Sequence, residues 1–169
     1  LKKLDPSRPT TFASNKRMRD VCLGLVDIVS WNIYTGWYSE DARETGKVLN
    51  ELLRWLHSPK SRGGRGKPVI MSEFGAGAIY GYRHPRRCHW TEEYQCEVLD
   101  ETLKVYLNHP QITGATIWQF CDCRVTDQKW ANRPRTMNNK GTVDEYRRPK
   151  QAYDVVKKRM RQAARKWDT

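Results

Sequence analysis

Several apolar segments of this 169-residue chain end in polar or aromatic side chains of the kinds found in catalytic sites. These segments are residues 26–34, 68–74 and 114–120, and the side chains near their ends include Asn32, Tyr34, Ser72, Glu73 and Trp118. A carboxylate among apolar neighbours loses hydration, so Glu73 needs either a partner or a chemical purpose. A catalytic carboxylate and a buried Glu satisfied by a backbone or Arg partner are both consistent with this composition.

Short apolar segments and amphipathic segments alternate along the chain. The predicted strands are residues 9–13, 26–34, 68–74 and 114–120, and the predicted helices are residues 41–57, 91–108 and 152–167. The near-continuous apolar character of the strands predicts a sheet that is buried on both faces. The alternation itself predicts a parallel sheet with crossover helices. In such a sheet the side chains that end the strands gather at one edge, where functional groups cluster.

Two α/β architectures satisfy this alternation, namely a small doubly wound domain and one half of an eight-stranded barrel. A nucleotide-binding fold is not supported, because the Gly-Ala-Gly-Ala segment at 75–78 lacks the third glycine and a helix directly behind it. The chain is long enough for one domain with a core. It contains no apolar run approaching the ~20 residues of a membrane-spanning helix. Its first residues lack an initiating Met, so it reads like the middle of a longer chain.

The charge of the chain is strongly basic, with a formal net charge of +12. Residues 133–169 hold twelve Lys or Arg against four Asp or Glu. This excess raises the alternative of a basic domain that binds nucleic acid or another polyanion. A solvated helix face is the preferred interpretation, because no nucleic-acid motif with interleaved aromatic residues accompanies the charges.

The cysteines do not suggest a structural role in cross-linking or metal binding. Five cysteines is an odd number for a disulfide framework, which favours a reducing compartment such as the cytoplasm. Cys121-Asp122-Cys123 and Cys88-His89 do not have the spacing of zinc ligands. We therefore predict neither a metal nor another cofactor.

Six short motifs occur in a fixed order along nearly the whole chain. They are Trp-Asn-Ile-Tyr-Thr-Gly-Trp-Tyr at 31–38, Met-Ser-Glu-Phe-Gly at 71–75, Trp-Thr-Glu-Glu-Tyr-Gln at 90–95, Ile-Trp-Gln-Phe at 117–120, Asn-Asn-Lys-Gly at 138–141 and Arg-Pro-Lys at 148–150. Together they resemble the C-terminal part of the catalytic TIM barrel of glycoside hydrolase family 2, and most of all its β-glucuronidases. The resemblance implies that residues 1–169 supply strands five to eight of a (β/α)8 barrel and are incomplete by themselves.

The resemblance also implies roles for individual residues. Glu73 matches the nucleophile of a retaining glycosidase, and Tyr34 matches the tyrosine that holds this nucleophile oriented and ionised. Trp118 matches one wall of the sugar subsite, with Asn32 and Tyr38 as further substrate-binding candidates. Asn138 and Lys140 match an Asn-x-Lys pair that binds the carboxylate of glucuronate, where an ammonium and an amide give charge-assisted hydrogen bonds. Arg135 is expected to assist this pair.

A retaining mechanism needs a second carboxyl group about 5–5.5 Å from the nucleophile. In the family this acid/base is the Glu of an Asn-Glu pair, but the only such pair here, Asn50-Glu51, falls within a predicted helix. We therefore expect the chain to lack the N-terminal barrel half and to have no appreciable activity alone. Its expected partners are that missing half, or further copies of itself, and a glucuronide substrate. A β-galactosidase-like or other family-2 specificity is the alternative within this class.

Overall fold

A parallel sheet of four strands forms the centre of the computed structural model, which describes residues 2–126 and 133–167. In chain order and in spatial order the strands are β1 (Ala13–Ser14), β2 (Val29–Asn32), β3 (Val69–Phe74) and β4 (Ile112–Ile117). All three neighbouring pairs are parallel. The predicted parallel sheet is therefore confirmed, and the carboxyl ends of its strands lie at the same edge of the sheet.

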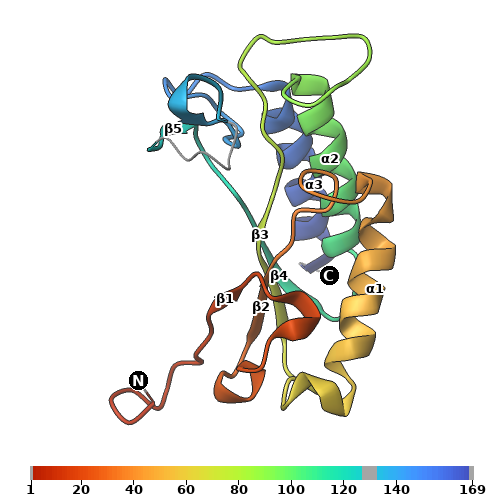
Figure 1. Ribbon diagram of the computed structural model, residues 1–169, viewed down its shortest axis with the longest axis vertical. Helices are drawn as coiled ribbons and strands as arrows, with labels where there is room; N and C mark the ends of the chain where they lie inside the picture. The colour runs from red at the N-terminus through yellow and green to blue at the C-terminus, as the bar shows by residue number, and fades with distance from the viewer. Residues whose placement is uncertain (1, 127–132, 168–169) are drawn as a thin grey trace.

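The three long helices are α1 (Thr45–Leu56), α2 (Glu92–Tyr106) and α3 (Gln151–Trp167), and they lie on the same side of the sheet (Figure 1). Asp41 forms a capping box with Glu44 in the 3-10 turn that leads into α1. The side chain of Thr91 accepts a hydrogen bond from the backbone of Tyr94 and so caps α2. The described part of the chain has no helix that is both long and apolar enough to cross a bilayer.

The core lies between the sheet and the helices. Val29 and Trp31 from β2 pack there with leucines of α1 and α2, and Val69 and Met71 from β3 join them. The opposite face of the sheet is less covered, because Thr113 and Thr116 of β4 are exposed. The prediction that the strands are buried on both faces holds for β2, whose Val29, Ser30 and Trp31 are all buried, but it is wrong for β4. The three long helices of the described residues all pack against one face of the sheet.

The first strand was predicted at residues 9–13 but is the two-residue β1, paired with Ser30 and Trp31 of β2. Pro9 has no backbone N–H for a ladder. The backbone N–H and the hydroxyl of Thr10 both bind the side chain of Asp27, at 2.6 and 2.8 Å. The carbonyl of Thr10 also accepts the backbone N–H groups of Asp27 and Ile28 at 3.0 and 3.1 Å. Regular pairing with β2 begins only at Ala13, so the strand begins later than the apolar pattern indicated.

A second, antiparallel pair of strands lies beyond β4 and was not predicted. It joins β5 (Cys123–Arg124) to β6 (Met137–Asn138). The pair brings residues 138–141 back toward the end of β4, where the Gln119 N–H donates to the carbonyl of Lys140 at 3.0 Å. This return places the Asn-Asn-Lys-Gly motif beside the carboxyl edge of the main sheet.

Candidate active site

A β-bulge at Ser72 determines where Glu73 points. Met71 pairs with Trp31 of β2, whereas Glu73 pairs with the next residue, Asn32, so β3 contains one extra residue. Side chains alternate along a strand, and an unbroken β3 would direct residue 73 to the helix side together with Met71. The bulge reverses this alternation. Phe74 consequently enters the core, where its ring lies 5.2 Å from that of Tyr106, and Glu73 faces a cleft on the other side.

Tyr34 holds the carboxylate of Glu73. It lies two residues beyond β2, and its hydroxyl donates a hydrogen bond to Oε2 of Glu73 at 2.8 Å. Burial, followed by the hydrogen bond to Glu73 and its negative charge, raises the pKa of Tyr34 above the ordinary value. The phenol thus stays protonated and remains a donor to the carboxylate throughout the neutral range.

The cleft around Glu73 has a volume of about 690 Å³. It is lined by seven of the eight residues predicted for the site, namely Asn32, Tyr34, Tyr38, Glu73, Trp118, Asn138 and Lys140. They come from the ends of β2, β3 and β4 and from the segment that begins in β6. Among the described residues that line the cleft, Glu73 is the only carboxylate.

Lys140 is a buried cation in this cleft, with only 4% of its surface exposed. Its ammonium donates to the Tyr38 hydroxyl at 3.1 Å and lies 5.0 Å from the ring centres of both Trp37 and Tyr38. Such contacts with aromatic faces favour a cation that has lost water. Burial lowers the pKa of Lys140 to about 8, with the positive charge of Arg133 as a smaller cause in the same direction. The side chain is therefore largely charged at pH 7 and has spare donors for an anion.

The remaining predicted residues are fixed by short-range bonds. Asn138 accepts the backbone N–H of Lys140 at 3.3 Å, and Asn32 accepts the hydroxyl of Ser72 at 2.8 Å. Trp118 is 39% exposed. Its backbone N–H donates to the carbonyl of Phe74 at 2.8 Å, and Phe74 is the residue that follows Glu73 in the chain. The peptide bond between Trp118 and Gln119 is cis. An exposed indole face beside the cleft suits packing against the C–H groups of a sugar.

Arg135 is the one predicted site residue that does not line the cleft. Its guanidinium instead lies 3.8 Å from the carboxylate of Glu145, and its side chain is more than half exposed. Arg133, two residues earlier, lines the cleft in its place. Arg133 immediately precedes the short 3-10 turn Pro134–Thr136, whereas Arg135 lies inside it with a φ of 58°, so the two side chains take different directions.

Sequence reasoning also missed four further cleft residues, which are Asn15, Arg17, Arg19 and Ser39. Asn15 directly follows β1. Functional side chains gather at the carboxyl ends of parallel strands, so a correct placement of β1 would have predicted Asn15 as a site residue. Arg17 is bound to the carboxylate of Glu40 by two hydrogen bonds of 2.8 and 3.3 Å. Among the described residues, four cations and one carboxylate line the cleft, which makes it a favourable place for an anionic ligand.

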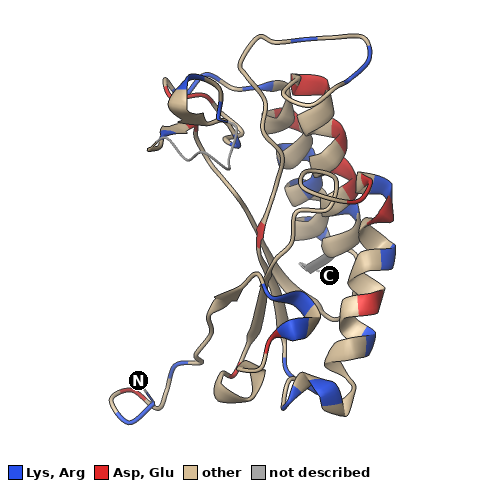
Figure 2. Ribbon diagram, in the orientation of Figure 1, with Lys and Arg blue, Asp and Glu red and all other residues tan. Residues whose placement is uncertain are grey.

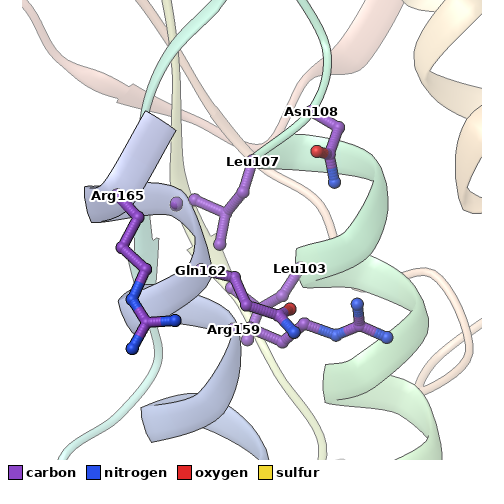
Figure 3. A pocket seen from close by; sticks show the side chains of 7 residues that line it. Leu103, Leu107, Asn108, Arg159, Gln162 and Arg165 are labelled. Atoms are coloured by element: carbon purple, nitrogen blue, oxygen red, sulfur yellow. The ribbon is translucent and has the colours of Figure 1, made fainter. Parts of the chain in front are cut away.

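The surface away from the cleft holds no second group of predicted site residues among the described residues. Within the described ranges, no cluster of three or more His, Cys, Asp or Glu side chains could hold a metal ion. A pocket of about 360 Å³ lies between α2 and α3, with Leu103, Leu107, Asn108, Arg159, Gln162 and Arg165 around it (Figure 3). It shares no residue with the cleft. Figure 2 shows basic residues spread over helices and loops, with acidic residues between them on α1 and α2.

The comparison with protein families defines the class of this chain. Residues 1–164 match the family described as glycosyl hydrolases family 2, TIM barrel domain. The chain belongs to this family, and its parallel sheet with flanking helices is part of the family's TIM barrel. The resemblance stated from the sequence motifs is thereby confirmed.

The relatives similar to this chain include a β-galacturonidase and β-glucuronidases. The chain is 49% identical to the GH2 β-galacturonidase of Eisenbergiella tayi, whose structure with galacturonate superimposes with a TM-score of 0.88 over 95% of this chain and 28% of that one. It is 28% identical to a β-glucuronidase of an uncultured Clostridium species, with a TM-score of 0.81 over 95% of this chain and 27% of that one. It is also 31% identical to the β-glucuronidase of Streptococcus agalactiae, over 94% of this chain and 26% of that protein. The chain thus spans about a quarter of the length of these relatives.

Proposed function

We propose that this chain supplies the nucleophile and the sugar-carboxylate site of a retaining β-uronidase. The observation that carries the proposal is the buried Lys140 ammonium, which lines the same cleft as Glu73. A neutral sugar offers a buried ammonium only uncharged hydroxyl acceptors, whereas the C6 carboxylate of a uronic acid also brings the opposite charge and forms a charge-assisted hydrogen bond with it. Asn138, held beside Lys140, adds an amide donor.

The proposed reaction has two displacements at the anomeric carbon. A carboxylate oxygen of Glu73 forms a bond to this carbon while the bond to the aglycone oxygen breaks, and that oxygen takes a proton from a general acid. Water then attacks the same carbon, the ester bond to Glu73 breaks, and the acid/base group recovers a proton from the water. Two inversions retain the β configuration. Tyr34 keeps Glu73 fixed for the first attack.

The identity of the uronic acid is the finer part of the proposal. The motifs favour a glucuronide, and the relatives at about 30% identity are β-glucuronidases. The 49% identity to a β-galacturonidase supports a β-galacturonide instead. The two sugars share the C6 carboxylate and differ only in the configuration at C4. We therefore propose β-uronides as the substrate class, with galacturonides preferred.

The acid/base carboxyl is proposed to come from outside the described cleft, because Glu73 is the only carboxylate among the described residues lining it. Residues 1–169 are accordingly proposed as a partial catalytic domain that needs a complementary barrel half. The 169-residue protein should not measurably hydrolyse 4-nitrophenyl β-galacturonide or β-glucuronide. Turnover at a rate near that of a complete enzyme would contradict this part of the proposal.

The main test uses a chimera in which residues 1–169 replace the corresponding segment of the Eisenbergiella tayi β-galacturonidase, hereafter the chimera. Its kcat/KM is measured with 2,4-dinitrophenyl β-galacturonide, β-glucuronide and β-galactoside, and we expect both uronides to exceed the galactoside. A hydrogen bond to a charged group contributes about 1.5–3 kcal/mol, so Lys140→Ala should lower the uronide values roughly 10- to 100-fold. The galactoside value should change little.

Lys67 provides a matched control lysine. Its ammonium donates to the carbonyls of Leu23 and Val26, and the residue lies just before β3, at the end of the strand away from Glu73. Lys67→Ala should leave the ratio of uronide to galactoside kcat/KM unchanged. If Lys140→Ala lowered uronide and galactoside hydrolysis equally, the assignment of a uronate carboxylate to this cleft would be rejected.

A further inference from the structure

Lys150 is a second buried lysine, and it belongs to the Arg-Pro-Lys motif, for which no role has been assigned so far. Its side chain has no exposed surface. Its ammonium donates to the carbonyl of Ala78 at 2.6 Å, to Oδ1 of Asp122 at 2.8 Å and to the carbonyl of Asn139 at 3.0 Å. An ammonium has three donors, so this contact set uses all of them.

The three acceptors come from three different parts of the site. Ala78 lies four residues beyond the end of β3, which carries Glu73, and Asp122 lies in the segment after β4, beyond Trp118. Asn139 lies between the two residues proposed to bind the sugar carboxylate. One buried charge therefore joins the segment after the nucleophile strand to the segment that holds Lys140.

Asp122 and Gln95 strengthen the same junction. Oδ1 of Asp122 also accepts the backbone N–H of Gly141 at 2.8 Å. The side-chain amide of Gln95, which is fully buried, donates to Ala76 at 2.9 Å and to Gly141 at 3.0 Å. A Cβ at Gly141 would lie only 2.3 Å from the backbone nitrogen of Asp122, so residues 138–141 approach the segment after β4 too closely for any side chain at position 141.

We propose that Lys150, together with Asp122, is a positioning residue that fixes residues 138–141 against the segment after β3 and thereby sets the preference for uronides. The proposal rests on the proposed function, since it assigns a purpose to the segment that carries Asn138 and Lys140. The sugar is bound at two ends, with its anomeric carbon at Glu73 and its carboxylate at Lys140. The spacing between these two segments then decides whether both ends are engaged at once.

Energetics favour a positioning role over simple stabilisation. Burying two charges costs hydration that their attraction recovers only in part, and apolar replacements of such pairs are often neutral or stabilising. An apolar side chain at position 150 would fill the same space but could not bind three oxygens from three segments. A shift of about 1 Å between reacting groups is enough to lower rates about a hundredfold.

The test compares Lys150→Met and Asp122→Asn in the chimera. For the galacturonide we expect kcat/KM to fall about 10- to 100-fold, mainly through a higher KM, as for the loss of groups that orient a ligand-binding residue. For the galactoside we expect a change of less than about threefold, because Glu73 is held by the sheet and not by this junction. Equal losses on both substrates, or no loss on either, would overturn the proposal.

A second variant and a control keep the test decisive. Gln95→Met removes the uncharged link to Gly141 and should shift the uronide-to-galactoside ratio in the same direction, which covers the case in which Lys150→Met does not fold. Asp100→Asn weakens a partly exposed ion pair between α2 and α3, where Arg159 donates at 2.6 and 2.7 Å. It should leave the ratio unchanged.

The variant Lys140→Ala separates the two proposals. If Lys140→Ala abolishes the uronide preference and the Lys150, Asp122 and Gln95 variants retain it, the positioning role is wrong while the proposed function stands. If Lys140→Ala itself leaves the preference intact, the proposed function fails first, and a shift in the Lys150 variant would then have no carboxylate site to act through.

Discussion

The two halves of the cleft are held in place by different means. Glu73 lies on β3 of the central sheet, and the bulge at Ser72 sets the direction of its side chain. β3 is hydrogen-bonded to β2 on one side and to β4 on the other. Lys140 stands in a segment outside that sheet, and it is fixed by buried side chains that reach in from α2 and from the residue before α3. The first arrangement depends on backbone geometry, and the second depends on a few particular side chains.

In the proposed function, this difference separates the chemical step from the choice of sugar. Attack on an anomeric carbon requires the same nucleophile position whatever the sugar carries at C6, and a sheet supplies a rigid platform for it. Recognition of a C6 carboxylate requires only a segment that places one cation and one amide. Replacement of a few side chains in or behind residues 138–141 is thus expected to change the preferred sugar while the site around Glu73 stays intact.

The largest expected effect tests the nucleophile half. Glu73→Gln in the chimera keeps the shape of the side chain but removes the negative charge that makes its oxygen nucleophilic, so kcat/KM should fall on the order of 10⁴-fold or more. The fall should be the same for the galacturonide and the galactoside, because both use the same displacement. Rates are measured from release of 2,4-dinitrophenolate.

A small external nucleophile checks the assignment of Glu73 independently. Azide added to Glu73→Ala should attack the anomeric carbon directly and yield the α-glycosyl azide, which NMR identifies by its inverted configuration. A β-configured azide would instead indicate that Glu73 is the acid/base residue and would contradict its role as the nucleophile.

The same comparison explains what the sequence predicts well. Helical spacing and capping residues located α1, α2 and α3 to within a few residues, because amphipathic periodicity and local caps are encoded in neighbouring positions. The strand ends that carry Asn32, Glu73 and Trp118 were predicted for a similar reason. Their side chains do line one cleft, as expected for a parallel sheet.

Long-range contacts account for the failures. The bulge at Ser72 depends on pairing with two other strands, and nothing in residues 69–74 alone distinguishes it from a regular strand. Arg133 lines the cleft in place of the predicted Arg135, and this depends on the conformation of the turn before β6. Asn15 was missed because regular pairing between β1 and β2 begins only at Ala13, later than the apolar pattern indicated. The junction at Lys150 was invisible because its partners lie 11, 28 and 72 positions away in the chain.

The second prediction concerns pH and tests the sugar-carboxylate half. Burial lowers the pKa of Lys140 to about 8, so the free enzyme loses this positive charge as the pH rises through 8. The uronide carboxylate stays ionised, and kcat/KM should therefore fall about tenfold per pH unit above 8, reaching roughly a hundredfold at pH 10.

The ratio of galacturonide to galactoside kcat/KM, measured from pH 6 to 10, isolates this titration from others that affect both substrates. The ratio should be flat below pH 7 and should decline above pH 8. In Lys140→Met, which cannot titrate, it should be low and independent of pH. A ratio that stayed constant in the unmodified chimera would show that Lys140 does not bind the substrate in its charged form.

The smallest effect is expected from Tyr34→Phe, and it again distinguishes the two halves. The substitution removes the hydroxyl that donates to Glu73 at 2.8 Å but keeps the ring, whose centre lies 5.6 Å from the Lys140 ammonium. The loss of one hydrogen bond to a carboxylate costs about 1.5 kcal/mol or somewhat more, equivalent to about a tenfold lower kcat/KM. Since the hydroxyl acts on the nucleophile alone, the galacturonide and the galactoside should lose the same factor. A change in their ratio would mean that Tyr34 also contributes to recognition of the carboxylate, and that the two halves of the cleft are less separate than their supports indicate.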